Sequence, residues 1–242
     1  MKFALIGYGK MGKEIEQVIK DTQAGEVVLK VTEQNLHELT TQNLQQCDVA
    51  IEFTQPDSAV KNIYTCFEAG IPVVVGTTAW LHQLDEVKTQ CAAKNGALFF
   101  SPNFSIGVNL FWEANRKLAQ LMNSQPQYQI DMVEIHHTEK KDAPSGTAVK
   151  TAEVILPEID RYQKWQLVNE GETSTAPLLP IVALRQPNVP GTHTVTYTSA
   201  VDSISITHEA KSRRGFAEGA VVAAKWLVGK KGVFDMKDLL NF

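Results

Sequence analysis

The sequence has few cysteines, no long apolar run and no excess of basic residues. Its three cysteines, Cys47, Cys66 and Cys91, have neither metal-binding nor redox spacing, and each lies in or beside an apolar run, so we expect buried free thiols. No segment approaches the roughly 18 apolar residues of a membrane span. The amino-terminal MKFALIGYGK does not read as a signal peptide, because its apolar run is short and leads straight into glycines. We therefore expect a cytoplasmic protein.

The composition is that of an ordinary soluble globular protein. The 242 residues are 43% hydrophobic and 21% charged, enough to bury a substantial core in one large domain or two modest ones. Acidic residues outnumber basic ones by 27 to 23, which gives a net charge of −4. This balance argues against nucleic acid or an anionic membrane as the main partner. The sequence contains no internal repeat and no low-complexity tract.

Short apolar runs alternate with amphipathic segments over the first hundred residues. The runs predict strands at 3–6, 27–31, 49–54, 73–75 and 97–100. Helices are predicted after Gly7, over 56–69 and over 81–95, where apolar residues recur three or four apart. A short polar link joins the second and third strands. This alternation is typical of a parallel sheet covered on both faces, in which ligands bind at the carboxyl ends of the strands.

A glycine-rich motif, GxGxxG, follows the first strand and opens the first helix, which is the context that dinucleotide binding requires. Gly7 permits the tight turn, Gly9 lets a pyrophosphate approach the backbone, and Gly12 allows close packing of helix on strand. The alternative is a glycine-rich turn without a ligand. The predicted phosphate loop consists of Gly7, Tyr8, Gly9, Lys10, Met11 and Gly12.

The residues after the other strands are the remaining candidates for cofactor contacts. A carboxylate at the end of the second strand would favour NAD over its 2′-phosphorylated form. Here Thr32 occupies that end and Glu33 comes one residue later, while Lys30 could help a 2′-phosphate, so NADH and NADPH both stay open. The candidates after the later strands are Thr54, Gly76, Thr77, Thr78, Ser101, Asn103 and Phe104.

The second half of the chain has a different pattern. Helices are predicted over 107–122 and 145–156, and a polar stretch over 158–176 is predicted to be a loop. The predicted strands lie at 128–137, 178–185, 192–200 and 202–210, and the last two are close enough for an antiparallel hairpin. This half is predicted to be α+β with an open sheet. The closing segment GFAEGAVVAAKWLVGKKG predicts an amphipathic helix that could belong to either half.

Residues 134–148, EIHHTEKKDAPSGTA, combine proton donors with a helix start. Imidazole and ammonium groups, at His136, His137 and Lys140, can both donate protons. A Ser-Gly-Thr helix start offers free backbone N–H groups to an anion. An ordinary strand with one buried and one exposed histidine is an equally good interpretation of the short motif taken by itself. Beside a dinucleotide loop, the segment instead predicts chemistry on a carboxylated substrate.

Four segments now stand in order along the chain: the glycine loop, GTT after the 73–75 run, SPNFSIGVNL, and EIHHTEKKDAPSGTA. Together they resemble the 4-hydroxy-tetrahydrodipicolinate reductase (dihydrodipicolinate reductase) family nearly end to end, and HHxxKxDAPSGTA is highly specific. The resemblance implies reduction of 4-hydroxy-tetrahydrodipicolinate, by way of dihydrodipicolinate, to tetrahydrodipicolinate with NADH or NADPH. This reaction belongs to the diaminopimelate route of lysine biosynthesis.

The resemblance also implies an α/β architecture of two domains and a homotetramer. A Rossmann-type parallel-sheet cofactor domain would span 1–104 and 213–242. An α+β domain with an open mixed sheet, residues 105–212, would bind the cyclic dicarboxylate substrate and form the oligomer contacts. The glycine loop is one residue shorter than the GxxGxxG form common in the family, and this departure falls on the adenosine side of the cofactor.

The family pattern implies a role for each matching residue. His136 and Lys140 would be the acid–base pair and His137 a substrate contact, while Ser145, Gly146 and Thr147 would hold a substrate carboxylate. The cofactor would contact the phosphate loop and the residues after the strands. Two further positions near the cofactor are Arg213 and Phe216.

Two other functions stay open on the residues alone. One is a different two-domain NAD-dependent oxidoreductase acting on an aldehyde or a sugar, which would not need Lys140 and the helix start together. The other is an NADH-sensing module that regulates a partner and has no use for HHTEK.

Overall fold

The protein is described by a computed structural model covering residues 1–172, 176–212 and 214–242. The chain divides into two compact units, and each is described by itself. Unit 1 comprises Met1–Ser105 and Arg214–Phe242, and unit 2 comprises Ile106–Arg213. Among the described residues, no helix is long and apolar enough to cross a membrane.

Unit 1 is built on a six-stranded sheet in the order β11-β5-β4-β3-β1-β2, and every pairing in it is parallel. Apart from the two outer strands, its members are almost wholly buried, which explains their continuous apolar sequences. The strands are β1 (Lys2–Ile6), β2 (Glu26–Val31), β3 (Val49–Glu52), β4 (Val73–Val75), β5 (Ala97–Phe100) and β11 (Gly232–Phe234).

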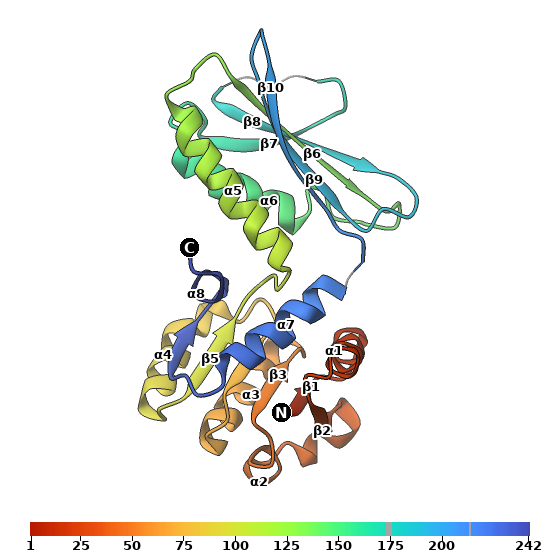
Figure 1. Cartoon of the computed structure of the whole chain (residues 1–242), viewed down its shortest axis with the longest axis vertical. Helices are drawn as coiled ribbons and strands as arrows, with labels where there is room; N and C mark the ends of the chain where they lie inside the picture. The colour runs from red at the N-terminus through yellow and green to blue at the C-terminus, as the bar shows by residue number, and fades with distance from the viewer. Residues whose placement is uncertain (173–175, 213) are drawn as a thin grey trace. The chain divides into compact units, whose positions relative to one another are not determined.

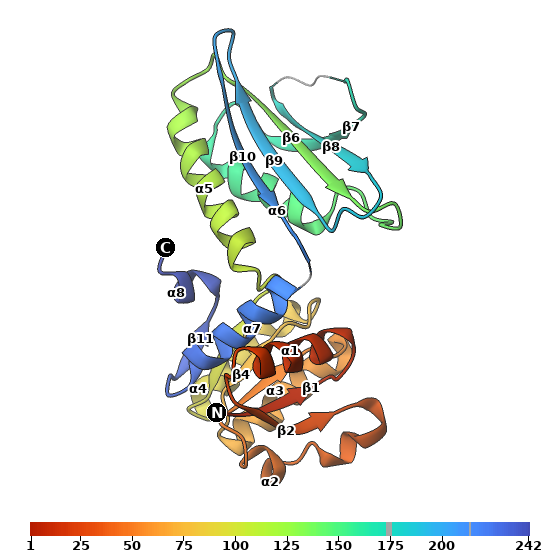
Figure 2. The same cartoon turned by 45° about the vertical axis from the view of Figure 1, so that its right-hand side comes forward.

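Helices cover both faces of this sheet (Figures 1 and 2). The helices α1 (Lys10–Asp21) and α7 (Arg214–Leu227) pack against each other on one face, and α3 (Pro56–Ala69) and α4 (Leu84–Ala93) lie on the other. Pro56 occupies the first turn of α3, where its missing N–H costs no hydrogen bond, and Gly70 ends the helix in the left-handed conformation. The parallel sheet predicted from the alternating pattern is confirmed.

Three parts of unit 1 correct the sequence analysis. The link between β2 and β3 is not simply polar chain, because it forms the 3-10 helix η1 (Glu33–Glu38) and the short helix α2 (Thr41–Leu44). Threonine side chains cap both, which explains why a polar sequence is helical there. The helix predicted over 81–95 begins as a 3-10 turn, η2 (Leu81–Gln83). The closing segment ends with the strand β11 and the helix α8 (Met236–Leu240), beyond the single predicted helix.

Unit 2 is a five-stranded mixed sheet in the order β10-β9-β6-β8-β7. The β6–β8 and β7–β8 pairs are parallel, whereas β6–β9 and β9–β10 are antiparallel, and the last pair is the predicted hairpin. The strands are β6 (Gln129–His136), β7 (Lys164–Val168), β8 (Leu178–Arg185), β9 (Thr192–Thr198) and β10 (Ser203–Glu209).

Helices cover one face of the unit 2 sheet, as Figure 1 shows, and bury its apolar side chains. They are α5 (Ile106–Asn123), α6 (Gly146–Ile155) and the 3-10 turn η3 (Leu156–Glu158). Alternate residues of β6, Ile130, Met132, Glu134 and His136, point into this covered face.

The loop predicted over 158–176 is wrong for its middle part. Residues 164–168, KWQLV, form the edge strand β7, which pairs with β8. Its side chains are half-buried or exposed, so the sequence lacks the apolar run that identified the central strands. The last three residues of the predicted loop before Ala176 lie outside the described residues.

Candidate functional site

The glycine loop at the carboxyl end of β1 has the backbone that its sequence predicts. Gly7 has a φ of +95°, and a Cβ there would lie 2.0 Å from the Phe53 carbonyl oxygen. A Cβ at Gly12 would lie 2.3 Å from the Gly7 carbonyl oxygen. Both positions therefore require glycine, because the turn brings backbone against backbone.

Gly9 differs, because a Cβ there would meet no atom within 4 Å. The residue is the N-cap of α1, and no side chain caps that helix. No side chain therefore competes for its first N–H groups, which suits a phosphate. This cradle of backbone donors beside an open glycine fits the pyrophosphate of a dinucleotide. Lys10 is exposed and Met11 half-buried beside it.

Next to this loop lies a charged cluster around the buried carboxylate of Glu16. The Lys30 ammonium lies 2.9 Å from Glu16 and 5.0 Å from the centre of the Tyr8 ring, and the Tyr8 hydroxyl donates to Glu16. Hydrogen bonds from Lys20, then from Tyr8 and Lys30, lower the pKa of Glu16 to about 2. Lys30 is thus already paired, and a 2′-phosphate would have to compete with Glu16 for it.

The end of β2 carries no buried carboxylate for a ribose. Thr32 is the N-cap of η1, where its side chain accepts from the Gln34 N–H and its own N–H donates to Asn35 Oδ1 at 2.6 Å. Glu33 is exposed in the first turn of η1. Neither residue therefore presents the fixed acid that would commit the site to NADH.

The carboxyl ends of β3 and β4 are joined through Thr54 and Thr77. The Thr54 N–H donates to Thr77 Oγ1 at 2.7 Å, and the Thr54 hydroxyl donates to the carboxyl of Glu52, which is fully buried. Asn62 also donates to Glu52, at 3.2 Å. Burial raises the pKa of Glu52, and these hydrogen bonds offset only part of that effect. Glu52, which supports the predicted cofactor residues Thr54 and Thr77, was not among the residues predicted from the sequence.

The other predicted cofactor residues follow β4 and β5. Gly76 is close-packed, since a Cβ would lie 2.1 Å from the Phe53 ring, and Thr78 is exposed. The Ser101 hydroxyl donates to the Asn103 carbonyl at 2.7 Å and accepts from the Asn103 N–H at 3.2 Å, which closes a tight loop.

Phe104 is buried, and its ring lies 5.9 Å from that of Phe53 and 5.8 Å from that of Phe99. Its side chain therefore belongs to the core of unit 1. Phe216 is half-buried in the first turn of α7. Arg213 lies outside the described residues.

In unit 2 the predicted catalytic segment is organised around Glu134, which is fully buried. The Ser145 N–H donates to both Glu134 carboxylate oxygens, at 3.1 and 3.0 Å. Nitrogens of His136, His193 and Arg185 lie 3.7, 3.6 and 3.6 Å from these oxygens. The carboxylate thus joins β6 to α6, β8 and β9.

Strand pairing brings these residues together from distant parts of the sequence. The antiparallel β6–β9 register places Glu134 opposite His193, and the parallel β6–β8 register places His136 opposite Arg185. The two imidazole rings lie 5.1 Å apart at 74°. Sequence reasoning missed Glu134, His193 and Arg185, although the alternation of β6 puts Glu134 on the same face as His136.

Electrostatics separate the charge states of the cluster. Burial lowers the pKa of His136 to about 4, and electrostatic interactions with His193, Lys140 and Arg185 lower it further, whereas Glu134 raises it. Burial alone would raise the pKa of Glu134, but hydrogen bonds from His193 and Ser145 hold it well below its usual range. At neutral pH the cluster therefore contains a carboxylate and a neutral His136.

Lys140 lies on the loop after β6, next to half-exposed His137. Its ammonium is 2.8 Å from both carboxylate oxygens of Asp142. Arg185 holds the backbone of this loop, since Nη2 donates to the Asp142 carbonyl at 2.7 Å and Nε to the Lys140 carbonyl at 3.3 Å. The loop thus holds the Lys140 ammonium in an ion pair with the Asp142 carboxylate.

The amino terminus of α6 supplies a second place for an anion. Ser145 is its N-cap, and the Ser145 hydroxyl accepts from the Ala148 N–H and lies 3.1 Å from His193 Nε2. A Cβ at Gly146 would meet no atom within 4 Å. Because the N–H groups of Ser145 and Ala148 are engaged, those of Gly146 and Thr147 are the donors left for a carboxylate.

Ligand atoms of Glu134, His136 and His193 lie within 4.8 Å of one another, a spacing that could hold a metal ion. The carboxylate already accepts from the Ser145 N–H and faces Arg185, so the described contacts account for it without an ion. Sequence spacing gave no sign of this group, because His193 comes from another strand.

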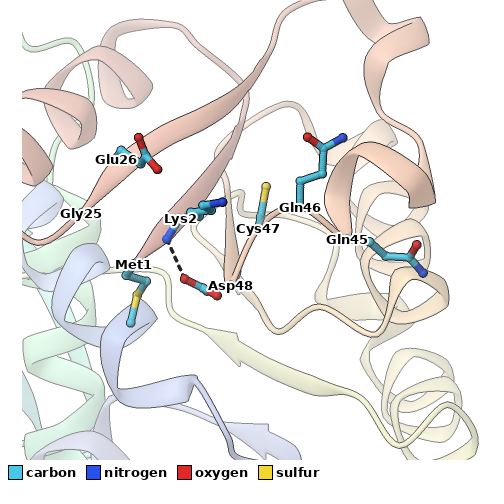
Figure 3. Close-up of a pocket in the computed structure, with 8 residues that line it drawn as sticks. All are labelled: Met1, Lys2, Gly25, Glu26, Gln45, Gln46, Cys47 and Asp48. Carbon is cyan, nitrogen blue, oxygen red and sulfur yellow. Dashed lines mark hydrogen bonds between the residues drawn. The ribbon is translucent and has the colours of Figure 1, made fainter.

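A separate hollow in unit 1 lies at the amino ends of the strands (Figure 3). There the Lys2 N–H donates to Asp48 at 2.7 Å. Since ligands of parallel sheets bind at the opposite, carboxyl ends, this hollow is not the dinucleotide site. Its lining comprises Met1, Lys2, Gly25, Glu26, Gln45, Gln46, Cys47 and Asp48.

Comparison with protein families gives two matches that together span most of the chain. Residues 1–104 match the family model described as dihydrodipicolinate reductase, N-terminus. Residues 107–240 match the model described as dihydrodipicolinate reductase, C-terminus.

Two curated relatives and one solved structure illustrate the similarity. The chain is 47% identical to the 4-hydroxy-tetrahydrodipicolinate reductase of Christiangramia forsetii over all of this chain and 98% of the relative. It is 37% identical to the enzyme of that name from Neisseria gonorrhoeae, over 82% of this chain and 74% of the relative. The dipicolinate-bound dihydrodipicolinate reductase from Paenisporosarcina sp. has a TM-score of 0.79 at 22% identity, covering 98% of each chain, which shows a common fold.

Proposed function

The chain belongs to the dihydrodipicolinate reductase family, and we propose how its residues carry out the reaction. That reaction is the NAD(P)H-dependent reduction that the family performs in lysine and diaminopimelate biosynthesis. The substrate is 4-hydroxy-tetrahydrodipicolinate, reduced by way of dihydrodipicolinate. The observation that carries the assignment is the joining of His136 and the α6 amino terminus through one buried carboxylate.

Unit 1 holds the cofactor. The α1 amino terminus and Gly9 receive the pyrophosphate, and the residues after β3, β4 and β5 line the nicotinamide end. Bound NADH or NADPH supplies the hydride that reduces the substrate ring. Because Thr32 and Glu33 offer no buried carboxylate and Lys30 pairs with Glu16, the adenosine side accommodates either cofactor. Rates of NADH and NADPH oxidation with freshly generated 4-hydroxy-tetrahydrodipicolinate measure this preference.

Unit 2 holds the substrate through its two carboxylates. One accepts from the N–H groups of Gly146 and Thr147, which the capping pattern leaves available. The other pairs with the cation of Lys140, for which it must compete with Asp142, with His137 beside it. The solved relative that contains dipicolinate, a planar dicarboxylate, supports this class of ligand.

Reduction builds negative charge on the ring, and a proton must follow. The Lys140 ammonium stabilises that charge in a partly dry site. Because the pKa of His136 is lowered well below neutrality, its imidazole is mainly neutral at pH 7 in the free protein. The proton therefore comes from Lys140, or from His136 once the charge of a bound dicarboxylate has raised the imidazole pKa.

Substitution of His136 tests the assignment. A positioned proton donor typically contributes about 10² to 10⁴-fold to the rate, so His136→Gln should lower kcat far more than it raises KM. Lys140→Arg keeps the positive charge but removes a useful proton donor. If Lys140 only stabilises charge, this variant keeps most of kcat, and if Lys140 donates the proton, kcat falls as in Lys140→Met. A near-normal kcat for both His136→Gln and Lys140→Met would refute the site.

The uncovered face of the unit 2 sheet is our candidate for the homotetramer contact. Val133 and Ile135 on β6 pair with Val182 and Leu184 on β8 and point away from the helices. This apolar stripe is only half-buried within the chain. Light scattering of purified protein should give the mass of four chains, and Val133→Glu should lower it. We place the enzyme in the cytoplasm, which cell fractionation would test.

A further inference from the structure

Glu134 contacts groups from four different elements of unit 2. Its carboxylate lies at the point where β6, α6, β8 and β9 meet, and it is fully buried. A buried carboxylate is costly unless it is hydrogen-bonded and its charge is balanced. Here the Ser145 N–H supplies two hydrogen bonds and Arg185 supplies the balancing charge at 3.6 Å.

On the histidine side, Glu134 faces Nδ1 of His136 at 3.7 Å. Within the described residues, that buried nitrogen has no hydrogen-bond partner, so the carboxylate is the nearest group that can favour a proton on it. An Nδ1–H tautomer leaves Nε2 as the nitrogen available to a substrate. Glycine at position 191 keeps the space beside Nε2 clear, since a Cβ there would lie 3.0 Å from that nitrogen.

On the helix side, Glu134 accepts from the Ser145 N–H, the first N–H group of the α6 amino terminus. With the Ser145 N–H directed to Glu134, the α6 amino terminus is held against β6, and the N–H groups of Gly146 and Thr147 remain as donors for an anion. A substrate carboxylate close to a buried carboxylate would be repelled without compensation. Arg185 provides that compensation and also fixes the Lys140 loop through two backbone carbonyls.

We propose that the ion pair of buried Glu134 with half-buried Arg185 is the positioning device of the reductase site. Glu134 sets the tautomer of His136 and anchors the carboxylate-binding helix start, and Arg185 neutralises Glu134 and holds the loop that carries Lys140. Neither residue contacts the reacting atoms. This inference rests on the proposed function, because it assumes that His136, Lys140 and the α6 amino terminus act on the substrate.

Two variants test the two halves of the pair. Glu134→Gln keeps the shape of the side chain but removes its charge. Since a misplacement of about 1 Å can cost about 10²-fold in rate, kcat should fall about 10²-fold, and dipicolinate should bind at least about tenfold more weakly, a loss of about 1.4 kcal/mol. Arg185→Lys keeps the charge beside Glu134 but cannot bind both loop carbonyls. It should lower kcat by about tenfold or more, the loss of one well-placed contact.

Nitrogen-15 NMR of the histidines measures the tautomer and pKa of His136, which would not change if Glu134 only supported the fold. The groups facing His136 are Glu134, His193, Lys140, Arg185 and Asp142, and the nearest anion among them is Glu134. Its removal should lower the His136 pKa further and replace the Nδ1–H tautomer with a mixture. In Arg185→Lys the tautomer should stay as in the unsubstituted protein. His136→Gln identifies the resonance.

Glu139, which is exposed in the same loop, provides the matched control. Glu139→Gln should leave kcat and the His136 tautomer unchanged, and dipicolinate binding should be unchanged or slightly tighter. Removal of a nearby negative charge by itself would tighten dipicolinate binding, so unchanged or tighter binding in Glu134→Gln, with kcat within twofold, would overturn the proposal. Normal kcat in Arg185→Lys would do the same. A chain with no reductase activity would refute the proposed function instead, and the tautomer would still show whether Glu134 controls His136.

Discussion

Two glycines one turn apart on α7 should respond oppositely to the same substitution. A Cβ at Gly219 would lie 1.7 Å from the Phe104 carbonyl oxygen, whereas a Cβ at Gly215 would meet only the Ser105 hydroxyl, at 3.7 Å. Both residues face the same direction, because they are four residues apart on a helix. The helix therefore touches the backbone of the 101–104 loop at one glycine and not at the other.

The magnitudes decide the sign. Replacing glycine by alanine inside a helix gains about 0.8 to 1 kcal/mol from propensity. At Gly219 the methyl would force α7 away from Phe104 by more than about 1 Å, and overpacking of this kind typically costs about 1 to 3 kcal/mol, occasionally more. An overlap this close with backbone lies in the upper part of that range, so after the propensity gain Gly219→Ala should be destabilising by about 1 to 2 kcal/mol. Gly215→Ala should be neutral or stabilising by up to about 1 kcal/mol, because its methyl fits an ordinary contact.

Melting followed by far-UV circular dichroism measures both variants. For a chain of this size, about 1 kcal/mol corresponds to about 2 to 4 °C in Tm. Gly219→Ala should melt several degrees below the unsubstituted protein and should also bind NADH more weakly, because the displaced helix rests on the end of a cofactor loop. Equal Tm values for the two variants would refute the packing argument.

Three further substitutions probe the two units. Gly9→Ala should leave the Tm unchanged, because the added methyl meets no atom. It should weaken NADH binding at least about tenfold, because the methyl occupies the space of the phosphate. A lower Tm would contradict this reasoning. Since burial raises the pKa of Glu52, its ionisation makes the folded state less stable as pH rises above about 4.5 and until the folded-state pKa is passed. Glu52→Gln should therefore raise the Tm more at pH 8 than at pH 5, and an equal change at both would count against a raised pKa. Gly191→Ala should displace the His136 ring and lower kcat, while the NADH affinity measured by titration of protein fluorescence should stay unchanged. A normal kcat would mean that His136 takes no part in the chemistry.

Much of the fold could be predicted because apolar periodicity and turn residues are local properties. The run 178–185 is β8 from end to end, and Pro56 and Gly70 lie at the two ends of α3. The strands β7 and β11 could not be predicted in this way. The first is a polar edge strand and the second has three half-buried residues, so neither carries a continuous apolar run.

The candidate site was predictable only where a motif is contiguous. The glycine loop and the Ser145 cap are local, and the structure gives both the expected backbone. Glu134 was visible in principle as an acid on the inward face of β6. Its partners His193 and Arg185 were not, because strand register brings them in from more than forty residues away.

Unit 1 is assembled from two stretches of chain that are separated by the whole of unit 2. During synthesis, β1 to β5 leave the ribosome first, and α7 follows only after more than one hundred further residues. At about 5 to 20 residues per second, that delay is on the order of ten seconds. Throughout it, the sheet face against which α7 packs is open apolar surface on the nascent chain. This interval, rather than the finished enzyme, is when aggregation or chaperone binding competes most strongly with folding.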